Sequence, residues 1–137
     1  MAEFRLTLTL RNLDGLKAKI RARTRRQREE IRHATLELGL EEYELVRALA
    51  NKDTGYMAEH IVLEFTRDGF NYVILLRARD FVGKVNPATG RTIDQFYPVF
   101  VVKGTKERAG NDFFRQARRI MKPRIRARYA RALRAGG

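Results

Sequence analysis

The sequence predicts an α+β fold in which an antiparallel sheet of about four strands packs on a long N-terminal helix, with a basic helix at the C-terminus. Three observations predict it. Apolar residues alternate at the start of the chain, change to a helical period from about residue 16, and alternate again in the middle between turn residues. With 137 residues and no break in composition, residues 1–137 are expected to form a single domain.

The first two elements follow from this periodicity. Residues 4–11 alternate between apolar and polar side chains, which predicts a strand with one buried face. Apolar residues within 16–49 fall near one helical stripe, which Thr24 and Gln27 interrupt. We therefore expect a long helix that bends near Gly39.

The charges of this predicted helix are divided between its halves. Residues 17–28 carry only positive charges, whereas glutamates dominate residues 29–44. An isolated helix is more stable with acids in its first turn and bases in its last. We expect something outside the helix to compensate this arrangement, although solvation alone would also account for it.

The middle of the chain predicts a hairpin. Apolar residues occupy alternate positions from Ile61 to Phe65 and again from Phe70 to Leu76, with Asp68 and Gly69 between the two runs. An Asp-Gly pair suits a tight hairpin turn. Further apolar residues at the intervening positions predict a sheet covered on both faces, one of them by the long helix.

Two segments follow the hairpin. Residues 83–95 contain a proline and two glycines and predict a loop that is long for a compact domain; such loops are often functional or disordered. Residues 97–102 predict a further strand, and Pro98 favours an edge strand or the start of a strand.

The last predicted element is a helix that begins near Asn111 or Asp112, because both residue types favour helix N-caps. It has no acid after Asp112, and Pro123 is expected to kink or restart it. Residues 123–137 are so basic that we expect a tail that becomes ordered on a partner. The positions expected to point inward are Phe113, Ala117, Ile120 and Met121.

The composition excludes several kinds of active site. The chain has neither Cys nor Ser, which excludes hydrolases with a Cys or Ser nucleophile. The absence of Cys also excludes disulfides and thiolate metal sites. His33 and His60 lie on different predicted elements without a third ligand at metal spacing, and the glycines form no phosphate-binding loop. We predict no catalytic residue, cofactor or metal, and a protein that is not an enzyme. We also expect neither a membrane anchor nor a signal peptide.

The net charge of +13 is the most unusual property of the chain. Most of its 29 basic residues are arginine, which binds carboxylates and phosphates through two hydrogen bonds and suits a partner surface. A GC-rich coding sequence would produce the same bias. The candidate interface residues lie on two basic helical segments and on the 83–95 loop, and are Arg21, Arg25, Arg28, Lys84, Arg91, Arg115, Arg118, Arg119, Arg124, Arg126 and Arg128.

One function that this charge suits is nucleic-acid binding, because basic helices can contact phosphates. The sequence contains no helix-turn-helix pair, zinc finger or RNA-binding aromatic sheet motif. Any such binding is therefore expected to be non-specific, and a DNA-binding accessory protein is the alternative function.

The order of short motifs resembles the small neck and tail-completion proteins, or tail components, of long-tailed double-stranded DNA bacteriophages. In that family a strand and a long charged helix precede an Asp-Thr-Gly segment, a hairpin, a segment with Tyr and Gly-Thr, and a closing helix. The matching residues in this chain are Asp53, Thr54, Gly55, Tyr97, Gly104, Thr105, Phe113 and Arg115. The chain departs from the family pattern at Val102, Lys103, Asp112 and Gln116.

The resemblance implies a structural virion protein, assembled in the host cytoplasm, that forms a homo-oligomeric ring of about six copies by head-to-tail contacts that close by rotation. Such a ring lies at the head–tail junction as a neck, tail-completion or tail-terminator protein. Its implied partners are head-closure and tail-tube proteins, with non-specific contact to DNA in the channel and no membrane.

Overall fold

The computed structural model describes residues 5–9, 24–50, 55–104 and 110–135. The predicted mixture of helix and sheet, with a long N-terminal helix and a C-terminal helix, is confirmed. The elements in chain order are β1 (Arg5–Thr9), α2 (Arg25–Ala50), α3 (Gly55–Glu59), β2 (Val62–Phe65), β3 (Tyr72–Arg77), the 3-10 turn η2 (Ala78–Asp80), α4 (Pro98–Lys103) and α5 (Phe113–Ala135).

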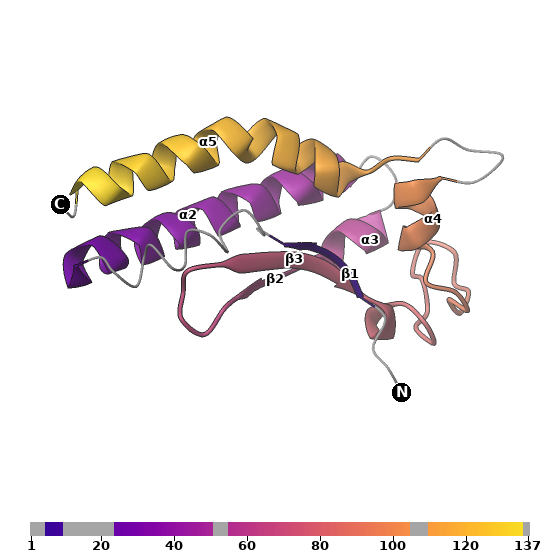
Figure 1. The fold of residues 1–137 in the computed structure, drawn as a ribbon. Coiled ribbons are helices and arrows are strands. Elements are labelled where there is room, and N and C mark those ends of the chain that lie inside the picture. The colour runs from indigo at the N-terminus through magenta and orange to yellow at the C-terminus, as the bar shows by residue number, and fades with distance from the viewer. Residues whose placement is uncertain (1–4, 10–23, 51–54, 105–109, 136–137) are drawn as a thin grey trace.

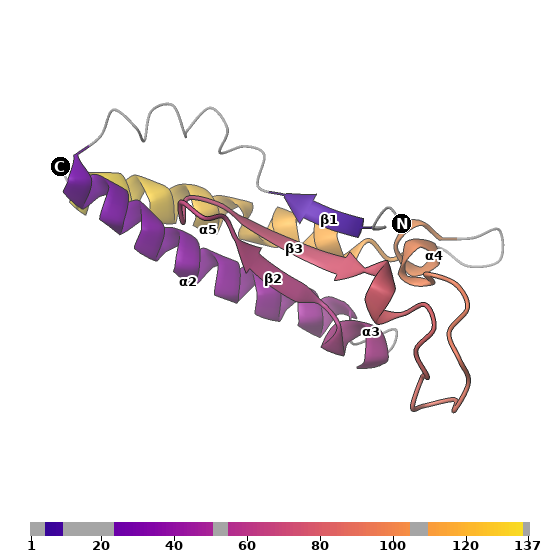
Figure 2. The same ribbon diagram turned by 90° about the horizontal axis from the view of Figure 1, so that it is seen from below.

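These elements form two layers (Figure 1). The helices α2 and α5 lie side by side in opposite directions and cover one face of the sheet. Figure 2 shows the sheet from the other side, with the order β1-β3-β2 and both strand pairs antiparallel. The described sheet has three strands, so the prediction of about four was wrong.

The central strand β3 supplies the part of the core that faces the helices. Its alternate residues Tyr72, Ile74 and Leu76 are buried there, as the period-2 pattern predicts. The hairpin that joins β2 to β3 is also confirmed, because Gly69 turns the chain with a φ of 78°. The Asp68 carboxylate accepts a hydrogen bond at 3.0 Å from the backbone amide two residues later, which stabilises the turn.

The other face of the sheet carries an ion pair between Arg77 and Glu64. In the part of the chain that the structure describes, no helix lies on this face (Figure 2). The expectation of a sheet covered on both faces is therefore not met by these elements. Leu75 on this face is nevertheless fully buried, and it pairs with Thr7 of β1 and Val62 of β2.

Within the two layers, α2 approaches the sheet closely at Gly39. A Cβ atom at this position would lie 2.8 Å from the Phe65 ring and 3.2 Å from the Tyr72 ring. Glycine inside a helix costs roughly 0.5–1 kcal/mol relative to alanine, and here its missing side chain makes room for two aromatic rings. The helix continues through Gly39 to Ala50.

The start of α2 differs from the prediction of a helix from residue 16. Thr24 precedes the first helical residue, and its hydroxyl accepts a hydrogen bond from the Gln27 amide at 3.2 Å. The Gln27 side-chain oxygen accepts one in return from the Thr24 amide at 3.2 Å. This is a capping box, in which two unpaired amides of the first turn gain partners. Residues 10–23 lie outside the described residues.

The predicted strand over residues 97–102 was wrong, because this segment forms α4. Pro98 is the first residue of that helix, where its fixed φ fits and its missing amide hydrogen is not needed. Gly104 ends it with a φ of 84°, as glycine commonly does after a helix. The apolar run was too short to separate a strand from one and a half turns of helix.

The helix α5 runs without interruption through Pro123, so the predicted restart does not occur. Phe113, Ala117 and Met121 are buried as predicted, but Ile120 is 53% exposed. Ile120 is next to Met121 in sequence and therefore lies about 100° away round the helix, outside the buried stripe. The segment expected to be a partner-ordered tail is helical to Ala135 and packs on α2 through Ile125, Tyr129 and Ala132.

Candidate interaction surfaces

Three ion pairs join the acidic half of α2 to α5. They are Glu42 with Arg118, Glu41 with Arg124, and Glu37 with Arg128. At the other end, the basic first turn of α2 lies beside the last turn of α5, where Gln27 contacts Leu133. The α5 arginines thus compensate the acidic half of α2, whereas the basic first turn of α2 meets a last turn of α5 that itself carries Arg134.

Glu42 is the buried member of these pairs. Its side chain is 0% exposed, and the Arg118 guanidinium donates to its carboxylate at 2.7 to 3.0 Å. The Tyr72 hydroxyl lies 3.4 Å from the same carboxylate. Burial raises the pKa of Tyr72, and the negative charge of Glu42 adds to this effect. A shift of α5 along α2 would leave a buried charge unpaired, so this pair sets the register of the two helices.

The contact nearer the start of α2 is more exposed. Arg128 donates to Glu37 at 2.8 Å, and this hydrogen bond lowers the pKa of Glu37. Beneath it, the hydroxyls of Tyr129 and Thr35 lie 2.7 Å apart, and burial raises the pKa of Tyr129. Glu37 and Arg128 also line a shallow groove of about 240 Å³ between the helices, together with the Glu41–Arg124 pair.

These contacts divide the candidate interface residues into groups. Arg118, Arg124 and Arg128 bind α2, a role that their sequence pattern did not reveal. Arg21 lies outside the described residues. Arg25 and Arg28 lie in the first turn of α2. The candidates at exposed positions away from α2 are Lys84, Arg91, Arg115, Arg119 and Arg126.

The outward side of α5 carries a line of exposed cations, which we call the basic row and which consists of Arg115, Arg119, Lys122 and Arg126. Their spacing of four, three and four residues places them on one face of the helix. Arg115 lies 3.8 Å from Asp112, and the other three make no ion pair with a described residue. Lys122 was missed as a candidate, although its helical spacing from Arg119 and Arg126 was visible in the sequence.

The predicted 83–95 loop is a projecting hairpin, which we call the arm and define as residues 82–95 (Figure 1). Val85 bridges to Thr92, and the Asn86 carbonyl accepts a hydrogen bond from the Gly90 amide at 2.7 Å at the tip. Val82 and Val85 are 46% and 58% exposed. The sequence pattern indicates the cations of this segment as interface residues and does not indicate its valines.

The arm is attached to the body by aromatic side chains. Phe81 is fully buried at its base, and the rings of Tyr56, Phe96 and Tyr97 lie edge-on to it at centroid distances of 5.3 to 5.4 Å. The Tyr56 hydroxyl donates to the backbone carbonyl of Asp80 at 2.7 Å. The base of the arm is thus fixed, while its tip projects into solvent.

A second exposed apolar surface lies on α2, and we call it the α2 patch. It consists of Leu36 and Leu40, which are 48% and 49% exposed, and of Phe65 on the neighbouring edge strand. The Phe65 ring packs at Gly39, between the turns that carry the two leucines. The α2 patch and the arm therefore involve different elements of the chain.

The residues that carry the family resemblance have structural positions where they are described. Gly55 begins α3, Phe113 is buried at the start of α5, and Tyr97 packs on Phe81. Asp53, Thr54 and Thr105 lie outside the described residues. The described motif residues therefore contribute to the fold itself.

Within the described ranges, no three His, Asp or Glu side chains come together in a way that could hold a metal ion. His60 instead stacks on Tyr56 with ring centroids 4.1 Å apart. None of the described helices is both long and apolar enough to cross a membrane. No protein-family model, curated protein or solved structure matches this chain.

Proposed function

We propose that this chain is a structural subunit that assembles with its own copies into a ring, through head-to-tail contacts. The observation that carries the proposal is the arm. It exposes Val82 and Val85 on a hairpin whose base is fixed in an aromatic cluster, although most of the hairpin contributes little to the core. Long loops that are ordered and add little to their own core are usually functional, as binding loops are.

A ring also requires a second, different surface on the same chain, because each copy must contact two neighbours in a head-to-tail arrangement. The α2 patch supplies a candidate for it, since its leucines belong to another element and are half exposed. Burying large apolar side chains at such positions against a neighbouring copy stabilises the contact between the two copies.

The proposed place of this ring is the head–tail junction of a long-tailed bacteriophage, where it joins head-closure proteins to the tail tube. This part of the proposal rests on the resemblance of the motifs. The strand, long helix, hairpin and closing helix follow in the order that the resemblance implies. The genes on either side are then expected to encode head-closure and tail-tube proteins.

Light scattering on the purified protein tests the ring directly. We expect the unaltered protein to form a closed oligomer, and both Val82→Asp/Val85→Asp and Leu36→Asp/Leu40→Asp to be monomeric. Ile120→Asp is the matched control, because it adds a charge at an exposed apolar position outside both surfaces.

Mixing the two defective variants tests whether the contact is head-to-tail. Each variant keeps one intact surface, so the mixture can form one good contact and is expected to give a dimer and nothing larger. A protein that stays monomeric at every concentration and on purified tails contradicts the proposal. So does a ring that survives both double substitutions.

A further inference from the structure

We propose that the basic row of α5 binds the phosphate backbone of duplex DNA without reading its base sequence. This inference goes beyond assembly and does not require that the ring forms. It starts from the division of charge on α5, which has no acidic residue between Phe113 and Ala135. The arginines nearest α2 are neutralised by its glutamates, and the basic row is not.

The dimensions of the basic row suit a phosphate backbone. Arg115 and Arg126 are eleven residues apart, so the row extends roughly 16 Å along the helix axis. B-DNA carries a negative charge about every 1.7 Å of its axis when both strands are counted, so a row of this length lies within reach of several phosphates. Four cations on one helical face can therefore contact several phosphates at once.

The surroundings of the basic row favour nucleic acid over an acidic protein. Pro123 follows Arg119 by one helical turn, and Ala130 follows Arg126 by one turn, so small side chains lie beside the cations on the exposed face. Protein–protein interfaces usually have an apolar and aromatic centre and contain little lysine. Phosphate contacts need only exposed donors that approach the backbone closely.

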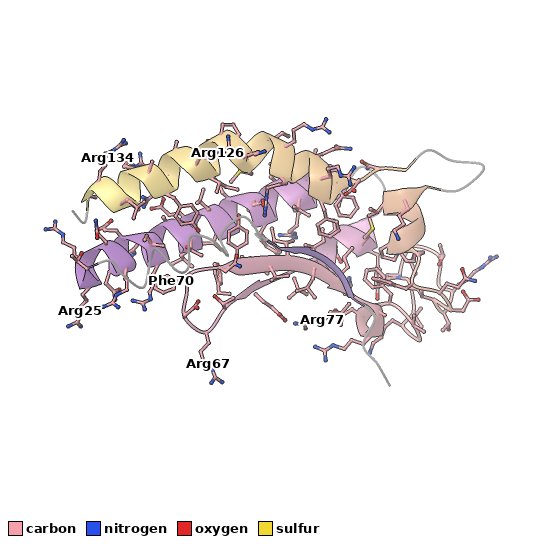
Figure 3. The ribbon with its side chains drawn as sticks, in the orientation of Figure 1. Arg25, Arg67, Phe70, Arg77, Arg126 and Arg134 are labelled. Carbon is pink, nitrogen blue, oxygen red and sulfur yellow. The ribbon has the colours of Figure 1, made fainter. Side chains whose placement is uncertain are left out.

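The positive surface continues past the basic row to the end of the helix pair. Arg134 is exposed in the last turn of α5, and the first turn of α2 with Arg25 lies beside that end, whereas Arg131 lines the groove with Glu37. Figure 3 shows Arg126 and Arg134 along the side of α5 that faces away from the sheet, and Arg25 at the adjoining end of α2. The sequence contains no helix-turn-helix pair or zinc finger, which is why we infer backbone contact alone.

Fluorescence anisotropy with a labelled duplex of arbitrary sequence, titrated at several salt concentrations, tests this inference. For the full chain we expect binding that weakens steeply as salt rises. Arg119→Gln/Lys122→Gln/Arg126→Gln should reduce the log–log salt slope by roughly 2.7, because each phosphate contact contributes roughly 0.9 to that slope. Unrelated duplex sequences should give equal affinities.

A matched control removes the same charge elsewhere. Arg67→Gln/Arg91→Gln/Lys103→Gln also replaces two arginines and one lysine, at exposed positions on the hairpin turn, the arm and α4. Figure 3 shows Arg67 at the turn between β2 and β3, on the side away from α5. We expect this control to keep nearly the full salt slope, and circular dichroism should show that both variants fold.

Three results would overturn the inference. Equal losses in the two triple variants would mean that net charge alone attracts DNA. Polyglutamate that competes as well as unlabelled duplex at equal charge would indicate an acidic protein partner. Absence of binding by the unaltered chain at low salt would show that the basic row does not bind DNA. Light scattering on the same samples reports the ring separately, so failure of either proposal can be recognised independently.

Discussion

One side of α5 faces α2 and the other faces outward, and the arginines on these two sides have different surroundings. Arg118 reaches a carboxylate that is 0% exposed, whereas Arg126 contacts no acid among the described residues. Both belong to the same basic run in the sequence. The difference teaches that a run of positive charge does not identify an interface until its internal partners are known, because three α5 arginines pair with glutamates of α2.

The largest expected effect concerns the inner side. Arg118→Leu leaves the buried Glu42 carboxylate with only the Tyr72 hydroxyl at 3.4 Å, so we expect a loss of about 3–5 kcal/mol in the free energy of unfolding, measured by urea denaturation. Replacing both partners, as in Glu42→Leu/Arg118→Leu, should recover most of that loss, since no buried charge remains. If Arg118→Leu alone had nearly normal stability, the Glu42 carboxylate would have to be accessible to water.

The next effect concerns the tyrosines between the helices and depends on pH. Burial raises the pKa of Tyr129 above its ordinary value of 10.0, so the folded state favours the protonated hydroxyl. Its contribution to stability is complete below pH 10.0 and falls as pH rises above it, by up to about 1.4 kcal/mol per pH unit. Tyr129→Phe should show a shallower decline in urea denaturation series at alkaline pH. An identical decline would mean that other groups cause it.

A smaller effect is expected at the exposed edge of the helix contact. The Glu37 side chain is 63% exposed, so solvent screening limits the Glu37–Arg128 pair to less than about 1 kcal/mol in a double-mutant cycle with Glu37→Gln and Arg128→Gln. Because Arg128 lowers the pKa of Glu37, this stability is present above pH 4.5 and is lost as pH falls through the lower, folded pKa. A coupling that persists after the carboxyl is protonated would have to come from packing.

The smallest effect belongs to the outward side. Arg126→Gln should change the free energy of unfolding by less than about 0.5 kcal/mol, because Arg126 makes no contact that folding requires. Arg124→Gln, two residues away and paired with Glu41, is the natural comparison and should cost a few tenths of a kcal/mol more. If Arg126→Gln lowered stability by more than the Arg118 substitution, the division of α5 into two sides would be wrong.

The sequence predicted the elements whose signal is local. The hairpin around Gly69 and the long helices follow from periodicity over many residues, and the structure contains them. The strand predicted at Pro98 was wrong because an apolar run of only six residues fits either a strand or a short helix. The start of α2 was missed although Thr24 and Gln27 have the spacing of a capping box.

The sequence predicted that basic residues of the C-terminal helix would form the candidate site. It did not predict which of them face α2 and which face outward. Glu42 and Arg118 lie 76 positions apart in the chain, and their pairing depends on how α5 docks on α2. Nothing in the local sequence distinguishes Arg118 from Arg119, although one is paired and the other exposed. Which of the two arginines faces α2 depends on how α5 is oriented about its own axis. That orientation is set by Phe113, Ala117 and Met121, which pack in the core.

A single amide side chain connects the ends of the two long helices. The Gln27 side-chain oxygen caps the start of α2, while its nitrogen donates to the Leu133 carbonyl in the last turns of α5 at 3.1 Å. Neither end can fray without taking a hydrogen bond from the other. Local opening at this end of the molecule should therefore be cooperative, and amide hydrogens in both terminal turns should exchange at a common rate. Removing the last residues of the chain would then loosen a helix that begins more than a hundred positions earlier.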